Sequence, residues 1–408
     1  MGGMTLAPYR AVLGIPGVTR LMLIAMLARI PITAAGVVLT LHVVLGLGRG
    51  YGPAGLVGAT VTVGAAIGAP LLGRVVDRHG LRRMLVVATI ADGAFWGAVP
   101  WLPYPALLGA AFVGGLLALP VFSVVRQSLA ALVPEGQRRP AYSVDSMSVE
   151  LSYMIGPVLG VLLATTVSTN AAVLTLGVTI VASGVAMYVL NPPVKSAAAI
   201  GAPRPPMRSW LRPQLTAVLL ATTACTLVLA GTDVGIVAAL QSTGQVSWIG
   251  LVLATWGLVS LLGGFVFGAM RRGVSALTLA LLLGLLTMPI GLFGDRWWVL
   301  CLALLPAGAL CAPTLAAVAD SVSRLAPETV RGLIMGLHGS ALTAGLALGA
   351  PLSGAVVDAS APRWAFVVTG GAGALLACGA IAVQRRWPAE VVLPQPAASS
   401  AATTSAIS

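Results

Sequence analysis

The sequence predicts an all-α membrane protein with twelve transmembrane helices in two similar halves. Of its 408 residues, 58% are hydrophobic and 8% are charged, whereas a soluble protein carries roughly a quarter charged residues. Apolar runs of about 20 residues, long enough to cross a bilayer, recur along the chain. Segments of the first half return in the second after about 193 residues, and such a repeat predicts two bundles of the same architecture.

The repeat is clearest at the ends of predicted helices. Leu-Val-Pro-Glu at 132–135 returns as Leu-Ala-Pro-Glu at 325–328, and Gly-Leu-Val at 55–57 returns at 250–252. Because the copies keep nearly constant spacing, each half should form one six-helix bundle, and the two bundles should be related by pseudo-symmetry. Two such bundles around a site near the middle of the membrane are typical of transporters.

The predicted helices are joined by short connections, and several contain Gly or Pro, which membrane helices tolerate. The longest connection is rich in Pro and Ala, and the last residues are mostly Pro, Ala, Ser and Thr, a composition typical of disorder. We expect an N-terminal segment at 1–20, a first bundle at 21–190, a linker at 191–213, a second bundle at 214–385 and a disordered tail at 386–408. The expected spans are residues 21–45, 52–72, 83–102, 105–127, 141–165, 170–190, 214–238, 247–269, 275–293, 297–319, 332–356 and 363–383.

The basic residues predict the orientation in the membrane. Of the 23 Lys and Arg residues, 19 fall on the side that holds both termini and the linker, three fall on the other side, and Arg29 lies within the first helix. Positive charge concentrates on cytoplasmic loops, so both termini and the linker are expected in the cytoplasm. The preference for Arg over Lys, with abundant Ala and Gly, favours a GC-rich bacterium and therefore its cytoplasmic (inner) membrane.

Several function classes lack their motifs. The net charge of +12 is spread over short loops and not over one soluble face, which argues against a nucleic-acid partner. The only lysine, Lys195, follows Pro-Pro-Val and belongs to no Walker A loop. The chain has no His-Glu-x-x-His or Gly-x-Ser-x-Gly sequence, and its cysteines are scattered through apolar runs. We expect no enzyme activity, catalytic residue, cofactor or metal, and a monomer in the lipid bilayer.

A basic loop after the second predicted helix carries the most specific motif. It reads Gly-Arg-Val-Val-Asp-Arg-His-Gly-Leu-Arg-Arg from 73 to 83. This resembles the signature Gly-x-x-x-Asp-Arg-x-Gly-Arg-Arg/Lys that the major facilitator superfamily carries between helices two and three. Leu81 stands where the family often has arginine, and the second-half copy is reduced to Gly-Ala-Met-Arg-Arg-Gly at 268–273. The resemblance, with the repeat, covers residues 20–385 and implies that family's twelve-helix fold.

We expect this loop to act as a cytoplasmic latch. A glycine lets two helices approach closely, a carboxylate can accept hydrogen bonds from a helix N-terminus, and a second glycine allows a turn with positive φ. The resemblance implies that Asp77 docks at the start of helix eleven, at residues 331–333, and interacts with an arginine at the end of helix four. The expected gating residues are Gly73, Asp77, Arg78, Gly80, Arg82, Arg83 and Arg126. The alternative is a basic loop that only sets the orientation.

A second motif lies in the fifth predicted helix. Exporters of the family often carry Gly-x-x-x-Gly-Pro-x-x-Gly-Gly there, and this chain has Gly156, Pro157 and Gly160, with Ser152 and Val161 at the outer positions. Small residues on one stripe allow tight helix packing. The resemblance favours export over uptake. Helix eleven carries a comparable Gly349-x-Pro351 run, so packing alone could also explain the motif.

Polar stripes run along two helices that match in the repeat. Arg29, Thr33 and Thr40 share one face of the first helix, and Thr222, Thr226 and Asp233 follow the same spacing in the seventh. In the superfamily, helices one, four, seven and ten line the central cavity. Arg29 and Asp233, with the threonines, are therefore candidates for contact with substrate or protons. The alternative is a buried structural ion pair.

Helix five supplies another carboxylate within the membrane. Asp145 lies near the basic loop, whereas Glu150 lies deeper and is expected either to pair with Arg29 or to exchange protons, because burial disfavours the charged form of a carboxyl group. His338 occupies the place of Asp145 in the second copy. It could titrate or serve only in packing.

Together, these features predict a secondary transporter that works by alternating access. We expect proton-coupled antiport that exports a small organic molecule, with protons and this substrate as its partners. A proton-coupled importer or a facilitator would have the same fold. A scaffold or sensor that transports nothing is the third reading, although Arg29, Glu150 and Asp233 within the membrane argue against it.

Overall fold

The computed structural model describes residues 6–195, 205–270, 273–293 and 296–386, and within these ranges every regular element is helical. The predicted disordered tail lies outside the described residues apart from Arg386, as do residues 1–5 and the middle of the linker. The helices are α1 (Ala7–Leu13), α2 (Val18–Leu41), α3 (Tyr51–His79), α4 (Leu81–Ala98), α5 (Tyr104–Leu117), α6 (Val121–Leu132), α7 (Arg138–Thr166), α8 (Thr169–Leu190), α9 (Met207–Trp210), α10 (Pro213–Ser242), α11 (Ile249–Ala269), α12 (Ala276–Thr287), α13 (Trp297–Leu325), α14 (Arg331–Ala359) and α15 (Pro362–Arg386).

Twelve segments within the described residues are long and apolar enough to span a membrane, which confirms the predicted fold class. Ten of them correspond to one long helix each, sometimes with a short helical turn at an end. The fourth span consists of α5 and α6 with a break at 118–120, and the ninth continues α12 into a short 3₁₀ segment, Met288–Phe293.

The spans extend beyond several predicted ends. The fifth runs over Glu135–Thr166 instead of 141–165, and the eleventh over Glu328–Ala359 instead of 332–356. A prediction from hydropathy stops where charged residues begin. The helical hydrogen bonds continue past that point, because backbone pairing does not depend on an apolar side chain.

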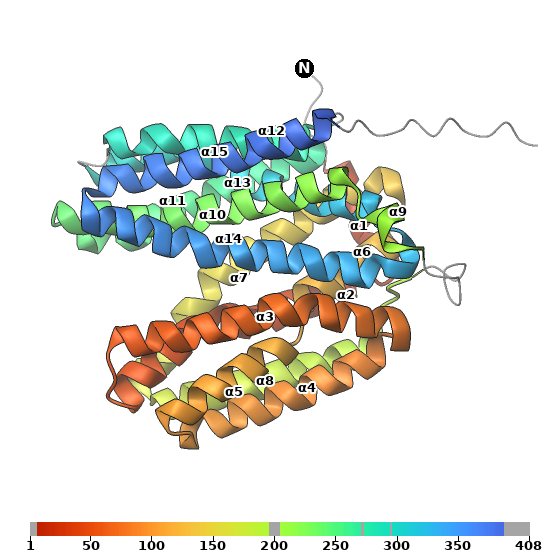
Figure 1. The fold of residues 1–408 in the computed structure, drawn as a ribbon, viewed down its shortest axis with the longest axis horizontal. Coiled ribbons are helices and arrows are strands. Elements are labelled where there is room, and N and C mark those ends of the chain that lie inside the picture. The colour runs from red at the N-terminus through yellow and green to blue at the C-terminus, as the bar shows by residue number, and fades with distance from the viewer. Residues whose placement is uncertain (1–5, 196–204, 271–272, 294–295, 387–408) are drawn as a thin grey trace, which may run out of the picture.

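The two halves of the chain form two bundles (Figure 1). The helices α10–α15 lie together, and α3, α4, α5 and α8 form the opposite side of the molecule. Across the boundary, α3 packs against α14, α7 packs against α11 and α13, and α6 packs against α14. The segments α1 and α9 and the end of α15 all lie at one end of the molecule, which we call the linker end.

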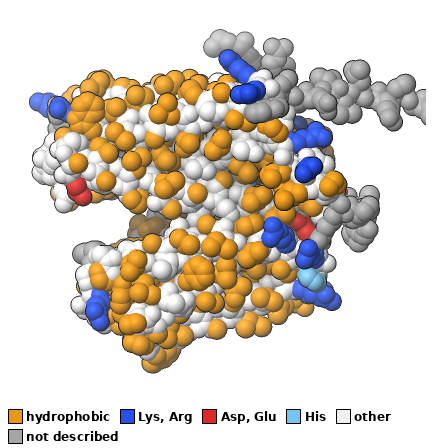
Figure 2. Space-filling view, viewed as in Figure 1, with side chains coloured by type: hydrophobic (Ala, Val, Ile, Leu, Met, Phe, Trp, Pro, Cys, Tyr) orange, Lys and Arg blue, Asp and Glu red, His pale blue; other side chains and the backbone are white. Residues whose placement is uncertain are grey.

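The hydrophobic cores reveal which end is closed. At the linker end, one core cluster includes residues of both bundles, from Val12 and Leu72 to Leu215 and Leu333. Toward the other end, the first bundle has its own core around Trp96, and the second bundle has a separate one. Figure 2 shows the same arrangement from outside, since the surface between the halves is hollowed on the side away from α9.

Hydrophobic side chains cover the flanks of both bundles, and Lys and Arg gather mainly at the linker end (Figure 2). Leu27 is 64% exposed and Leu375 is 75% exposed. Exposed leucines of this kind over the length of a transmembrane helix suit contact with lipid chains.

Candidate functional site

The loop motif positions Asp77 at the first turn of α14. Its Oδ1 accepts a hydrogen bond from the Gly332 amide at 3.0 Å, and its Oδ2 accepts one from the Leu333 amide at 2.9 Å. The first amides of a helix have no partner within the helix and carry partial positive charge. The carboxylate, with its side chain only 3% exposed, therefore joins the first bundle to the second at the linker end, where the family resemblance implies that it docks.

The two glycines of the loop allow this contact. A Cβ on Gly73 would collide with the carbonyl of Gly332, so only glycine lets α3 and α14 come this close. Gly80 ends α3 with φ +85°, a conformation that residues with a side chain rarely adopt. The basic residues of the loop, Arg78, Arg82 and Arg83, are exposed, and the guanidinium of Arg82 lies over the ring of Tyr188.

The linker also contributes to the latch. Lys195 Nζ donates to the backbone carbonyl of Asp77 at 3.0 Å and lies 3.6 Å from its Oδ1. Sequence analysis did not identify this contact. Lys195 is 118 residues from Asp77 along the chain, and no spacing or motif links them.

Arg126 takes a different place from the one that the resemblance implied. Its hydrogen bonds run to Asp145 Oδ2 at 3.2 Å and to His338 Nε2 at 2.8 Å, and it is 2% exposed. The reason is its position along α6. Arg126 lies six residues before the end of α6, which is about 9 Å along the helix axis, so it reaches the centre of the molecule.

Arg29 pairs with Asp145 and not with Glu150. Its Nη2 lies 2.5 Å from Asp145 Oδ1, and its Nη1 donates to Ser148 at 3.4 Å. Residues 145 and 150 lie on the same helix, α7, but five residues turn the helix by about 140° past one full turn. The two carboxylates therefore point in different directions, and Asp145 faces α2.

Asp145 thus holds two arginines in a fully buried network. Arg29 and Asp145 are each 0% exposed, and both oxygens of the carboxylate accept charge-assisted hydrogen bonds. Taking these charges out of water costs several kcal/mol per ion, and the cost is offset only where partners are well placed. The network therefore fixes α2, α6 and α7 relative to one another.

Glu150 and Asp233 lie on opposite bundles. Glu150 Oε1 accepts a hydrogen bond from Ser260 of α11 at 3.0 Å. Asp233, on α10, is exposed. Tyr153, one turn beyond Glu150 on α7, is 47% exposed. Each bundle therefore has one carboxylate within a spanning helix that forms no ion pair with Arg29 or Arg126.

The threonines of the predicted stripe have structural contacts. Thr33 Oγ1 donates to the backbone carbonyl of Ser152 at 2.8 Å, and Thr40 donates to a carbonyl of its own helix, at Gly36. A Cβ on Gly156 would collide with Thr33, and one on Gly160 would press on Ala34 and Val38. The small-residue motif around Pro157 therefore packs α7 against α2.

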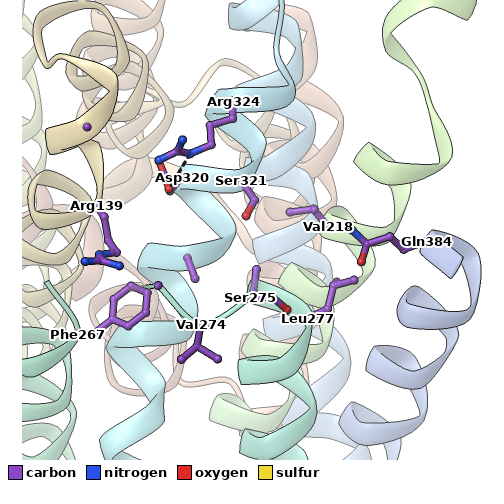
Figure 3. A pocket seen from close by; sticks show the side chains of 14 residues that line it. Arg139, Val218, Phe267, Val274, Ser275, Leu277, Asp320, Ser321, Arg324 and Gln384 are labelled. Carbon is purple, nitrogen blue, oxygen red and sulfur yellow. Dashed lines mark hydrogen bonds and ion pairs between the residues drawn. The ribbon is translucent and has the colours of Figure 1, made fainter. Parts of the chain in front are cut away.

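A cavity of about 360 Å³ is lined mostly by the second bundle, with Gly136 and Arg139 from the first (Figure 3). Its polar lining includes Arg139, Ser275 and Gln384, together with the ion pair of Asp320 and Arg324, in which Nε and Oδ2 are 3.0 Å apart. Arg324 also reaches Glu135 of the first bundle at 3.2 Å. In the described parts of the chain, no three His, Cys, Asp or Glu side chains gather as metal ligands.

Comparison with known proteins agrees with this geometry. The profile of the Major Facilitator Superfamily matches residues 21–240 and 225–406. Among solved structures, the human organic anion transporter MFSD10 (TETRAN) has 16% sequence identity and a TM-score of 0.71, covering 90% of this chain and 99% of its own. A bacterial homologue of the iron transporter ferroportin, in an outward-facing state, has 17% identity and a TM-score of 0.71 over 91% of this chain and 99% of its own.

A third structure of the same fold is the proton:xylose symporter XylE, with 14% identity and a TM-score of 0.69 over 91% of this chain and 95% of its own. Identities this low establish a shared fold and nothing finer. No curated protein sequence matches the chain significantly. The profile match over both halves, the twelve spans and the docked loop aspartate together show that this chain belongs to the Major Facilitator Superfamily, whose members are secondary transporters and not enzymes.

Proposed function

We propose that this transporter is a proton-coupled antiporter that exports a small organic molecule across the cytoplasmic membrane of a bacterium. It would act as a monomer, with both termini and the linker in the cytoplasm. The excess of basic residues at the linker end supports this orientation. With the linker in the cytoplasm, the hollow between the bundles opens outward, and the latch of Asp77 closes the cytoplasmic side.

The observation that carries the proposal is that each bundle has a carboxylate within a spanning helix, Glu150 on α7 and Asp233 on α10. Asp233 is exposed, and Glu150 accepts a hydrogen bond from Ser260 of the other bundle. In the outward-open state, protons from outside can neutralise these groups and weaken their hold on a substrate. After the bundles rock to open inward, loss of the protons to the cytoplasm restores the negative charges, which can then bind the next substrate.

The contacts of the carboxylates within the spanning helices indicate that Asp145 has a different role from Glu150 and Asp233. Asp145 is occupied by Arg29 and Arg126, so its charge is held in place. Glu150 has one hydroxyl as its hydrogen-bond partner, and protonating it separates no ion pair. Glu150 and Asp233 are therefore better suited than Asp145 to gain and lose protons during transport.

Inverted membrane vesicles with an acid interior and a pH-sensitive dye test the proposal. Substrates would come from an export screen of drugs and metabolites in efflux-deficient cells. For an antiporter, substrate entry into the vesicle releases protons and raises the interior pH. Glu150→Gln and Asp233→Asn should abolish the signal, and Asp358→Asn, a control at an exposed carboxylate near the far end of α14, should keep it.

The alternatives give different outcomes in the same assay. A proton-coupled importer would move protons and substrate in the same direction, so the interior would become more acidic as substrate enters. A facilitator would transport substrate without a pH signal. A scaffold or sensor would give neither transport nor signal with any compound. Activity of an extracellular phosphatase fused within the linker would contradict the proposed orientation.

A further inference from the structure

A hydrogen bond between Arg126 of α6 and His338 of α14 joins the two bundles. Arg126 Nη1 and His338 Nε2 are 2.8 Å apart. On its other side, His338 Nδ1 lies 3.3 Å from Thr222 Oγ1 of α10. The imidazole is 1% exposed, so no water competes for these contacts in this conformation.

The contacts among Arg126, His338 and Thr222 are compatible with only one placement of the protons on the imidazole. An arginine guanidinium only donates hydrogen bonds, so Nε2 of His338 must be the acceptor and carry no proton. A neutral imidazole then bears its proton on Nδ1, which faces Thr222. The threonine hydroxyl donates to the Val218 carbonyl at 2.9 Å, and its oxygen remains able to accept from Nδ1. His338 is therefore neutral in the conformation that is closed at the linker end.

The repeat explains why this histidine meets Arg126. His338 follows Asp145 by 193 residues, and Thr222 follows Arg29 by the same interval. The contact of Thr222 with His338 is thus the counterpart of the ion pair between Arg29 and Asp145. Arg126 binds both members of the repeat, Asp145 in its own bundle and His338 in the other.

We propose that protonation of His338 opens the contact between the two bundles at the linker end. Neutral His338 accepts the hydrogen bond from Arg126 and holds the bundles together at the linker end. Protonated His338 has no lone pair to offer and carries a positive charge beside the guanidinium, so the bond breaks and the bundles separate there. This protonation switch rests on the alternating access of the proposed function, but not on the direction of transport or on proton binding by Glu150 and Asp233.

The charges around His338 support this assignment. Among the helices packed against α14, α6 supplies Arg126, and α10 supplies the uncharged Thr222. On α3, Asp77 binds the first turn of α14, and on α13, Asp320 and Arg324 pair with each other. The arginines of α15 lie at its ends. The hydrogen-bond partners of the ring are Arg126 and Thr222, and neither has a negative charge that would compensate a second positive charge.

Asp233 belongs to a separate site. It lies 11 residues beyond Thr222 on α10, which is about 16 Å along the helix axis. Titration at Asp233 and titration at His338 can therefore be measured as separate effects.

Distances between spin labels on the full chain in lipid nanodiscs test the switch. Labels at Arg20 and Arg385, both exposed and at the linker end, report the separation of the bundles between pH 5 and 9. For the wild type we expect the separated population to grow as the pH falls. The ratio of separated to closed molecules should change by roughly tenfold or more, as for loss of a hydrogen bond to a charged group.

Two substitutions isolate the histidine. In His338→Gln, the amide oxygen reaches the position of Nε2, accepts from Arg126 and does not titrate, so the molecule should stay closed across the pH range. His338→Ala lacks the acceptor and should be more separated at every pH. Asp358→Asn, at an exposed carboxylate near the far end of α14, is the control and should respond like the wild type.

The same spin-label measurements on His338 variants that also carry Glu150→Gln and Asp233→Asn distinguish this proposal from the proposed function. The part of the pH response that depends on His338 should persist there, even if those carboxylates prove unrelated to transport. A wild type without pH response would overturn the switch, and so would a His338→Gln protein that responds like the wild type in both backgrounds. If His338→Ala does not fold, the glutamine variant alone decides.

Discussion

Substitution of Asp77 by asparagine tests the latch between the bundles. In the native protein, the two carboxylate oxygens of Asp77 accept from the amides of Gly332 and Leu333 at 3.0 and 2.9 Å. Asparagine keeps one acceptor oxygen. Its NH₂ group replaces the other and faces an amide that can only donate. The variant therefore loses the negative charge at the start of α14 and leaves one backbone amide without its acceptor.

The size of the effect follows from these contacts. A charge at a helix N-terminus contributes about 0.3–1 kcal/mol, and up to about 2 kcal/mol when partly buried. A buried amide left without a partner costs roughly 1–3 kcal/mol. The ion pair with Lys195 is lost as well, which acts in the same direction, although the lysine can keep its bond to the backbone carbonyl of residue 77. A total of about 2 kcal/mol would change the ratio of closed to open latch about 30-fold.

The spin-label distances at the linker end measure this ratio directly, and transport assays measure its consequence. We expect Asp77→Asn to insert normally, to populate the separated state more strongly and to transport slowly. Asp358→Asn removes a carboxylate from the exposed last turn of the same helix and should change neither quantity. An Asp77→Asn protein with the wild-type distance distribution and transport rate would refute the latch.

Three further substitutions test other parts of the structure. Asp145→Asn removes the carboxylate between two buried arginines, so thermal unfolding should show a loss of about 3–5 kcal/mol; wild-type stability would mean that the network is not essential. Gly156→Ala introduces a collision with α2 and should cost about 1–3 kcal/mol, whereas a Cβ on Gly354 meets open space and Gly354→Ala should not destabilise the protein. Burial raises the pKa of Tyr9 to about 12, above its value of about 10 in an unfolded chain. The bond from its hydroxyl to the Phe265 carbonyl should therefore stabilise the fold up to about pH 10 and lose its effect between pH 10 and 12, and the melting temperatures of wild type and Tyr9→Phe should converge over that interval.

Much of the fold could be predicted because it depends on local composition. The length of each apolar run fixes a span, and the repeat fixes the number of bundles. The loop motif also led to the right helix end, since the docking of Asp77 on α14 depends on a short segment and on the partial charge of a helix terminus. Gly73 and Gly80 follow from the same local reasoning.

The partners within the central network could not be predicted in the same way. They depend on how each helix is rotated about its axis, and neighbouring carboxylates on α7 point to different helices. Arg29 meets Asp145, and Glu150 meets Ser260. Arg126 was misplaced because the break in α5–α6 sets its depth, and Lys195 was overlooked because its contact depends on the path of the linker. His338 could be flagged from the repeat, but only the structure reveals its bond to Arg126.

Uphill transport by the Glu150→Gln/Asp233→Asn protein in liposomes tests the central claim most directly. If these carboxylates couple substrate to protons, the variant should lose accumulation driven by a pH gradient and keep the exchange of labelled for unlabelled substrate at equilibrium. It should also fold like the wild type, because neither residue balances the buried arginines. A variant that folds normally and still concentrates its substrate against a gradient would contradict the account.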